Sequence, residues 1–172
     1  MNAYILCGGQ SKRMGTNKIF VPIQGLPMAE YMYQKLHLAG FTNIYAVVKT
    51  KCSINIPQLV ETNRDFHPLY GVSSALEHTT SRFSLITPCD VPFVSQSTLK
   101  NLHAKREFVT VCSSEIQQPL LGVFPKALAT KAHNYAEQSL SVMNFVSTSQ
   151  RLLVSTFELT NINTPQNLKE NL

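Results

Sequence analysis

Short apolar runs alternate with helical patterns along most of the chain. Residues 4–7 form an almost unbroken apolar run that two glycines end, which is typical of a strand buried on both faces of a parallel sheet. Similar runs predict further strands at residues 20–23, 43–48, 58–61, 83–87, 108–112, 119–124 and 152–157. Apolar positions at helical spacing predict helices at residues 27–39, 71–78, 95–102, 127–135, 138–145 and 165–172.

Turn and cap residues mark several of these boundaries. Gln24 and Gly25 predict a turn that leads to Pro27, which is suited to the first position of a helix, and Gly40 suits the end of that helix. Ser95 or Ser97 supplies a hydroxyl for the first turn of a later helix. We expect the helix at 71–78 to be entered through Pro68, and strands 108–112 and 119–124 to be paired through the polar loop between them.

This alternation predicts an α/β fold of one domain over residues 1–172, a three-layer α/β/α sandwich with a Rossmann-like, mostly parallel sheet. The chain has 172 residues, of which 44% are hydrophobic, enough for one core. Right-handed crossovers place the carboxyl ends of parallel strands along one edge, and ligands bind beyond that edge at a topological switch point. We expect Gly8, Gly9 and Asp90 to lie there.

Composition and charge exclude several classes of protein. No apolar run approaches the roughly 20 residues of a membrane helix, and the first residues lack a basic leader. We therefore expect a cytoplasmic protein that does not bind a membrane. The four cysteines are scattered without a CxxC pair, which predicts reduced thiols. The net charge is +5, but the basic residues are spread singly, so nucleic acid is not expected as a partner.

The strongest local motif is residues 6–18, where a strand runs into Gly8 and Gly9 and three basic side chains follow. Glycines let backbone N–H groups approach an anion, so this chemistry suits a polyphosphate. The segment is not a Walker A loop, because Thr16 stands where that motif needs a lysine. It is not a GxGxxG motif, because Gly9 directly follows Gly8, and it is not a GxSxG nucleophile elbow, because Arg13 stands where the second glycine is needed. Taken alone, the segment also fits a glycine-rich surface loop.

A lone aspartate ends another apolar strand. Asp90 follows the strand at 83–87 and precedes an X-Pro step, which aims a hard oxygen ligand at the same edge as the glycines. The chain has only one other aspartate, Asp65, which lies in a polar loop. Asp90 is therefore the better candidate for Mg²⁺, although the same residue type is common in turns and helix caps.

A third motif covers residues 160–168, where Asn161 and Asn163 alternate with apolar residues before a Thr-Pro step. One amide oxygen could lie near a metal or phosphate while the other joins loops, but taken alone the segment is more typical of a helix cap than of a ligand. Cys7 and Cys89 flank the expected site. No histidine stands at a spacing that would activate them, so a thiol nucleophile is not expected.

Together the three motifs resemble the molybdenum cofactor guanylyltransferases, the MobA-like nucleotidyltransferase family. Residues 6–18 resemble its LAGGxSxRMGxxK pattern, residues 90–92 its DxP segment and residues 161–168 its NxNTPxxL segment, in the same order along the chain. Residues 67–71 and 118–120 look like its GPLAG and HPL segments. Three ordered motifs are more specific than any one of them.

The resemblance implies transfer of GMP from GTP to the terminal phosphate of molybdopterin, free or carrying molybdenum, with release of pyrophosphate and with Mg²⁺ as cofactor. It assigns catalytic or metal-binding roles to Arg13, Lys18 and Asp90, and Asn163 as a possible second metal ligand. It assigns the nucleotide to Leu6, Cys7, Gly8, Gly9, Lys18, Asp65 and Asp90. Asp65 matches a family aspartate only with a shortened spacing, so Thr62 or Asn63 could take that place.

Departures from the family pattern keep other functions open. Three positions differ from residues common in the family, namely Cys7, Asn17 and His67. These differences leave the choice of base more open than the transfer of a nucleotide. The alternatives are a molybdopterin cytidylyltransferase, a sugar-phosphate nucleotidyltransferase or a catalytically silent nucleotide-binding module. We expect a monomer that makes transient contacts with cofactor-delivery proteins or molybdoenzymes.

Overall fold

The central feature is a sheet with helices on both faces, seen in a computed structural model that describes residues 1–8 and 18–162. The strands are β1 (Asn2–Leu6), β2 (Pro22–Ile23), β3 (Leu26–Pro27), β4 (Ile44–Val48), β5 (Gln58–Val60), β6 (Phe83–Pro88), β7 (Val109–Cys112), β8 (Gln117–Pro125) and β9 (Gln150–Leu153). The α-helices are α1 (Met28–Leu38), α2 (Pro68–His78), α3 (Gln96–Ala104), α4 (Ala129–Glu137) and α5 (Val142–Phe145). Short 3-10 turns lie at Lys18–Phe20, Lys126–Leu128 and Thr156–Leu159.

The main sheet has seven strands in the order β5-β4-β1-β6-β8-β7-β9. β1 pairs in parallel with both β4 and β6, and only β8 runs against its neighbours. The chain moves outward from β1 to β4 and β5, then crosses through α2 to β6 on the other side of β1. The predicted, mostly parallel sheet is confirmed, and its switch point lies between β1 and β6.

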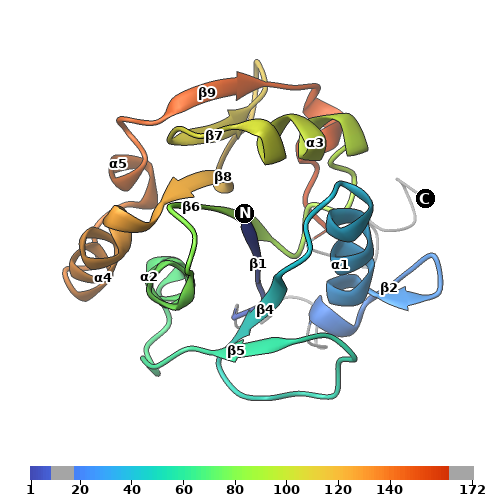
Figure 1. The fold of residues 1–172 in the computed structure, drawn as a ribbon, viewed down its shortest axis with the longest axis horizontal. Helices are drawn as coiled ribbons and strands as arrows, with labels where there is room; N and C mark the ends of the chain where they lie inside the picture. Colours follow the sequence, from blue (N-terminus) through green and yellow to red (C-terminus); the bar gives the residue numbers. More distant parts are fainter. Residues whose placement is uncertain (9–17, 163–172) are drawn as a thin grey trace.

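Two layers of helices cover this sheet. α1 and α3 lie on one face, and α2, α4 and α5 lie on the other (Figure 1). β1 shows how the sequence feeds both cores, because side chains alternate along a strand. Ala3 and Ile5 pack in the core under α1 and α3, whereas Tyr4 packs under α2 and α4, all fully buried. The three-layer α/β/α sandwich is confirmed.

Helix boundaries follow the expected caps. Pro27 immediately precedes α1 as its N-cap, and Gly40 follows the helix with a φ of 101°, a conformation that favours glycine. The α2 helix begins at Pro68 rather than at residue 71, because Pro68 suits the first turn of a helix. Ser95 is the N-cap of α3, and its hydroxyl accepts a hydrogen bond from the backbone N–H of Thr98. None of the helices in the described part of the chain is long and apolar enough to cross a membrane.

The extended segment expected at residues 20–23 is only half correct. Phe20 closes a 3-10 turn, and the strand covers Pro22–Ile23 alone. This strand forms a small hairpin with β3, which the sequence interpretation missed. Gln24 and Gly25 both have positive φ angles, 49° and 83°, as expected of the tight turn that reverses a hairpin.

Two later elements are also shorter than expected. The helix expected at 138–145 is limited to α5, because Ser139 has a φ of 51° and a new N-cap at Ser141 restarts the helix. The strand expected at 152–157 is the earlier segment β9, because its partner β7 ends at Cys112, whose carbonyl oxygen accepts the last hydrogen bond of the pair from the N–H of Val154. The paired strands β7 and β8 are confirmed. The terminal helix expected at 165–172 lies outside the described residues.

We predict that Phe145 is essential for docking α5 and α4 on the sheet. Its ring is fully buried among the rings of Phe124, Phe108 and Tyr135. Phe145→Ala should lower the free energy of unfolding by about 3–5 kcal/mol, measured by urea denaturation. Met143→Ala, on the exposed side of the same helix, should change it by no more than about 0.5 kcal/mol. Equal losses for both variants would contradict this packing.

Candidate nucleotide site

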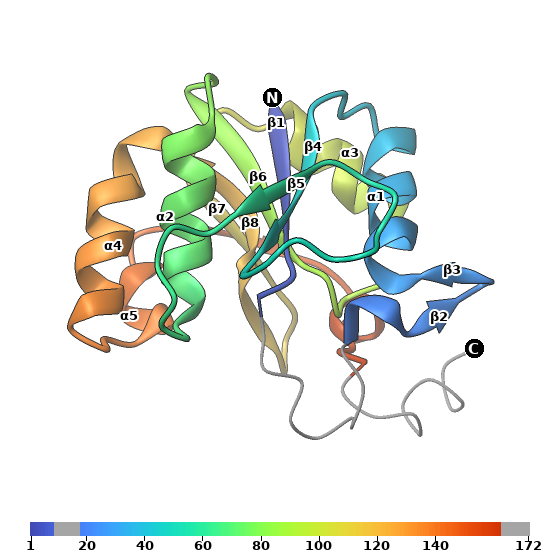
Figure 2. The ribbon, with the colours of Figure 1, turned by 90° about the horizontal axis from the view of Figure 1, so that it is seen from below.

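The candidate site lies where β1 and β6 end side by side. The backbone N–H of Cys7 donates to Val47 O at 2.8 Å, and that of Cys89 donates to Leu6 O at 3.2 Å. Backbone pairing therefore continues past both strand ends and fixes the chain just before Gly8 and Asp90. Figure 2 shows these ends on one side of the sheet, with α2 and α4 on one flank and α1 on the other.

Gly8 contacts a buried carboxylate that sequence reasoning did not single out. A Cβ added at Gly8 would lie 2.4 Å from Oε1 of Glu61, which is closer than real atoms approach, so a larger residue would require this carboxylate to move. Gly71, at the start of α2, faces the same oxygen, with a virtual Cβ 3.4 Å from it. Glu61 thus lies between the β1 turn and α2, with a side chain that is 4% exposed.

Lys18 and Asp90 form the ion pair of the site. Lys18 Nζ donates to Oδ2 of Asp90 at 2.9 Å, across 72 residues of sequence. The two side chains are 22% and 15% exposed, so both remain within reach of a ligand. The structure therefore brings together two of the three catalytic residues expected from the sequence.

Residues 154–162 return to this edge, where Ile162 lies beside Asp90. The backbone N–H of Ile162 donates to Asp90 O at 2.9 Å. Asn161 accepts a hydrogen bond through Oδ1 from Nε2 of Gln118 on β8, at 2.9 Å. Glu158 accepts hydrogen bonds from the Ser95 N–H and the Thr98 hydroxyl at the start of α3. The loop-joining role expected for one asparagine is thus filled by Asn161.

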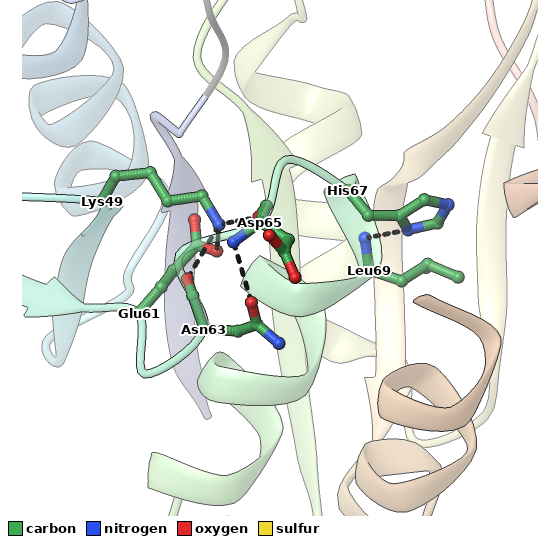
Figure 3. Close-up of polar contacts among 6 residues, drawn as sticks. All are labelled: Lys49, Glu61, Asn63, Asp65, His67 and Leu69. Carbon is green, nitrogen blue, oxygen red and sulfur yellow. Dashed lines mark hydrogen bonds and ion pairs between the residues drawn. The ribbon is translucent and has the colours of Figure 1, made fainter. Parts of the chain in front are cut away.

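A second lysine organises the loop at residues 61–67 (Figure 3). Lys49 Nζ donates to Oε2 of Glu61 at 2.6 Å and to the backbone oxygens of Asn63 and Asp65 at 3.1 Å and 2.6 Å. Asn63 Oδ1 accepts from the N–H of Asp65 at 2.8 Å. The loop is therefore folded around a single ammonium group.

Asp65, Thr62 and Asn63, the three residues that could correspond to the aspartate of the family pattern, differ in burial. Asp65 and Thr62 are exposed, and Asn63 is partly buried, with its amide oxygen engaged inside the loop. His67 is the N-cap of α2, and its Nδ1 accepts from the N–H of Leu69 at 3.2 Å, so it acts as a loop-to-helix turn. Glu61 is the carboxylate of this loop that is buried against Gly8.

Burial changes the protonation behaviour of two groups at this edge. It raises the pKa of the Glu61 carboxyl, and the hydrogen bond and charge of Lys49 oppose that rise. A hydrogen bond with Cys89, together with burial, raises the pKa of the Cys7 thiol well above its ordinary value. Since thiolate is the reactive form, Cys7 is unsuited to be a nucleophile, as expected. All four cysteines are free.

Several residues expected at the site cannot be placed. Gly9, Arg13 and Asn163 lie outside the described residues. Among the described residues, no cluster of three or more His, Cys, Asp or Glu side chains is positioned to hold a metal ion. Sequence reasoning missed Glu61 and Lys49, because one ends a predicted strand and the other looks like an ordinary surface lysine. The available signal was a charged residue directly after each of two apolar strands.

The fold is shared with solved nucleotidyltransferase structures. Molybdopterin-guanine dinucleotide biosynthesis protein A from Archaeoglobus fulgidus superposes with a TM-score of 0.80 at 18% identity, covering 99% of this chain and 96% of that protein. The 2-C-methyl-D-erythritol 4-phosphate cytidylyltransferase from Thermus thermophilus gives a TM-score of 0.72 at 14% identity, covering 99% and 97%. At these identities the likeness concerns the fold.

Sequence comparison identifies the family. A probable molybdenum cofactor guanylyltransferase from Flavobacterium johnsoniae is 29% identical, over 99% of this chain and 95% of its own length. Another from Rhodopirellula baltica is 30% identical, over 95% of this chain and 88% of its own length. Residues 3–152 match the MobA-like NTP transferase domain. Because this match covers most of the chain, the chain belongs to the MobA-like NTP transferase family.

Proposed function

We propose that the protein is a molybdenum cofactor guanylyltransferase, which transfers GMP from GTP to the terminal phosphate of molybdopterin, free or carrying molybdenum, and releases pyrophosphate. The observation that carries this proposal is the Lys18–Asp90 pair of 2.9 Å at the edge where β1 and β6 end. This is where an open α/β sheet binds nucleotides. Relatives over nearly the full chain are named for this activity.

In the proposed reaction, a phosphate oxygen of the acceptor attacks the α-phosphorus of GTP. A new P–O bond forms there, the bond to the bridging oxygen of the β-phosphate breaks, and pyrophosphate leaves with that electron pair. The acceptor oxygen is already anionic, so the protein needs no covalent nucleophile. Its contribution is to position two anions and to stabilise the charge that develops between them.

The residues of this chain fit those tasks. Lys18 offers an ammonium group to the phosphates, and its pairing with Asp90 holds it at the strand ends before a ligand arrives. Arg13 is proposed as a second phosphate clamp, because a guanidinium can make paired hydrogen bonds to a phosphate. The backbone of Leu6, Cys7, Gly8 and Gly9 is proposed to hold the nucleotide.

Mg²⁺ is proposed as the cofactor, with Asp90 as its ligand and Asn163 as a possible second ligand. Asp90 fits this role, since only its Oδ2 is engaged by Lys18 among the described residues and carboxylate oxygens suit Mg²⁺. One protein carboxylate is sufficient when phosphates supply further oxygens. Bound there, Mg²⁺ would neutralise charge on the phosphates.

Glu61 is proposed to recognise the guanine base together with, or instead of, Asp65. Guanine presents N–H donors on the edge where adenine and cytosine present ring nitrogen acceptors, so an ionised carboxylate favours guanine. Oε1 of Glu61 accepts no hydrogen bond in the described part of the chain and faces Gly8 and Gly71. This geometry favours guanylyl transfer over the cytidylyltransferase alternative. The cytoplasmic location, the monomeric state and contacts with cofactor-delivery proteins or molybdoenzymes stay predictions.

Calorimetric titration with GTP, CTP, ATP and UTP, with and without Mg²⁺, tests the substrate. We expect GTP to bind most tightly and to require Mg²⁺ for full affinity, because the triphosphate is bound as a metal complex. A preference for CTP would keep the transfer mechanism but contradict guanylyl transfer. Failure to bind any nucleotide would contradict the proposed function as a whole.

Asp90→Asn tests the catalytic role. We expect pyrophosphate release from GTP and molybdopterin to fall by at least ~10²-fold, the scale of losing a major charge-stabilising group. Glu115→Gln, which alters an exposed carboxylate on the β7–β8 turn, should leave the rate unchanged. If the wild-type protein binds GTP but transfers no GMP, the catalytically silent alternative is correct.

Glu61→Gln and Asp65→Asn, compared side by side, identify the carboxylate that contacts the base. Losing a hydrogen bond to a charged group costs about 1.5–3 kcal/mol, so we expect Glu61→Gln to weaken GTP binding by ~10- to 100-fold. Asp65→Asn should have little effect, since that side chain is exposed. Calorimetry gives both affinities, and the reverse order would assign the contact to Asp65.

A further inference from the structure

The ammonium group of Lys49 is fully engaged. Its three N–H donors are matched by Oε2 of Glu61 and by the backbone oxygens of Asn63 and Asp65, at 2.6, 3.1 and 2.6 Å. The rings of Phe66 and Tyr70 lie on further sides, each with its centroid 5.6 Å from Nζ. Lys49 is 17% exposed, so this arrangement is largely withdrawn from water.

Few other hydrogen bonds hold the loop at residues 61–67 that Lys49 contacts. Residues 62 and 64–66 are exposed and belong to no helix or strand. Among the described contacts, the remaining hydrogen bonds inside the loop are the short-range one from Asp65 N–H to Asn63 and the N-cap of His67. Since Lys49 follows β4 and the loop follows β5, the lysine joins the loop to the strand next to β1.

The same contact divides the two oxygens of Glu61. Oε2 accepts from Lys49 on the loop side (Figure 3), whereas Oε1 lies against Gly8 and Gly71. A carboxylate with a side chain 4% exposed would be costly without a cationic partner. Lys49 therefore opposes the rise that burial causes in the pKa of Glu61, and by holding Oε2 it leaves Oε1 facing Gly8.

We propose that Lys49 is a positioning residue that sets the nucleobase selectivity of the site, by aiming Oε1 of Glu61 at the base and by closing the loop at residues 61–67 beside it. This inference rests on the proposed function, in which Glu61 accepts a hydrogen bond from guanine. Lys49 itself touches neither the base nor the reacting phosphates in this proposal.

Lys49→Met, with Lys51→Met as the matched control, tests the inference. Lys51 is an exposed lysine two residues further along, so its loss removes the same charge without touching the loop. We expect Lys49→Met to lower kcat/KM for GTP at least ~10-fold, through KM, with kcat nearly unchanged. The ratio of GTP to ATP affinity, measured by calorimetry, should fall by a similar factor, whereas a general loss of structure would weaken both nucleotides alike.

If Lys49→Met is unstable, two further measurements test the role of Lys49. One is the nucleotide preference of Lys49→Arg, and the other is the hydrogen exchange of the loop amides. Arginine retains the charge and donor groups and should restore part of the GTP preference. Without nucleotide, backbone amides of residues 62–67 should exchange faster in Lys49→Met than in wild type or Lys51→Met, because the loop loses its tie. Unchanged exchange, or an unchanged GTP to ATP ratio, would overturn the role of Lys49. A wild-type protein that binds GTP no better than ATP would instead contradict the base assignment under the proposed function.

Discussion

The site depends on one constraint, the parallel pairing of β1 with a strand on each side. Leu6 is in register with Val47 of β4 and with Pro88 of β6, so the chain leaves all three strands at the same level. Hydrogen bonds from Cys7 and Cys89 extend that pairing by one further residue. A parallel sheet forces these ends together because its crossovers return each strand to the same edge. Asp90 and Lys18 therefore meet although 72 residues separate them.

Two lysine–carboxylate pairs at this edge serve different purposes because their exposure differs. The Lys18–Asp90 pair is partly exposed, so under the proposed function phosphates and a metal ion can replace its contact without leaving either charge unpaired. In the Lys49–Glu61 pair the carboxylate is almost completely buried, and the loss of its partner would leave a buried charge uncompensated. The first pair is therefore proposed to take part in the chemistry, and the second to hold the shape of the site.

The sequence was sufficient for the fold and for placing Asp90 at the edge where β1 ends, for a physical reason. Strand 83–87 and its following Asp90 could be recognised because a buried apolar run that ends in a hard oxygen ligand is a local pattern, and topology then places it beside the glycine turn. The small hairpin of β2 and β3 was missed because two-residue strands carry too little pattern. Glu61 was missed because its burial is created by Gly8 and Gly71, which approach from distant parts of the chain.

Glycine at position 8 connects two of the proposed contacts of the site, one with the phosphates and one with the base. The glycine was predicted for an anion, yet the space it leaves is taken by Oε1 of Glu61. A larger residue there would require the carboxylate to move, so glycine at this position keeps Glu61 in place. The fold is common to a molybdopterin-guanine dinucleotide biosynthesis protein A and a cytidylyltransferase alike. Since a fold does not determine which ligand binds, selectivity between bases must come from side chains at the site, and under the proposed function these are Glu61 and the loop held by Lys49.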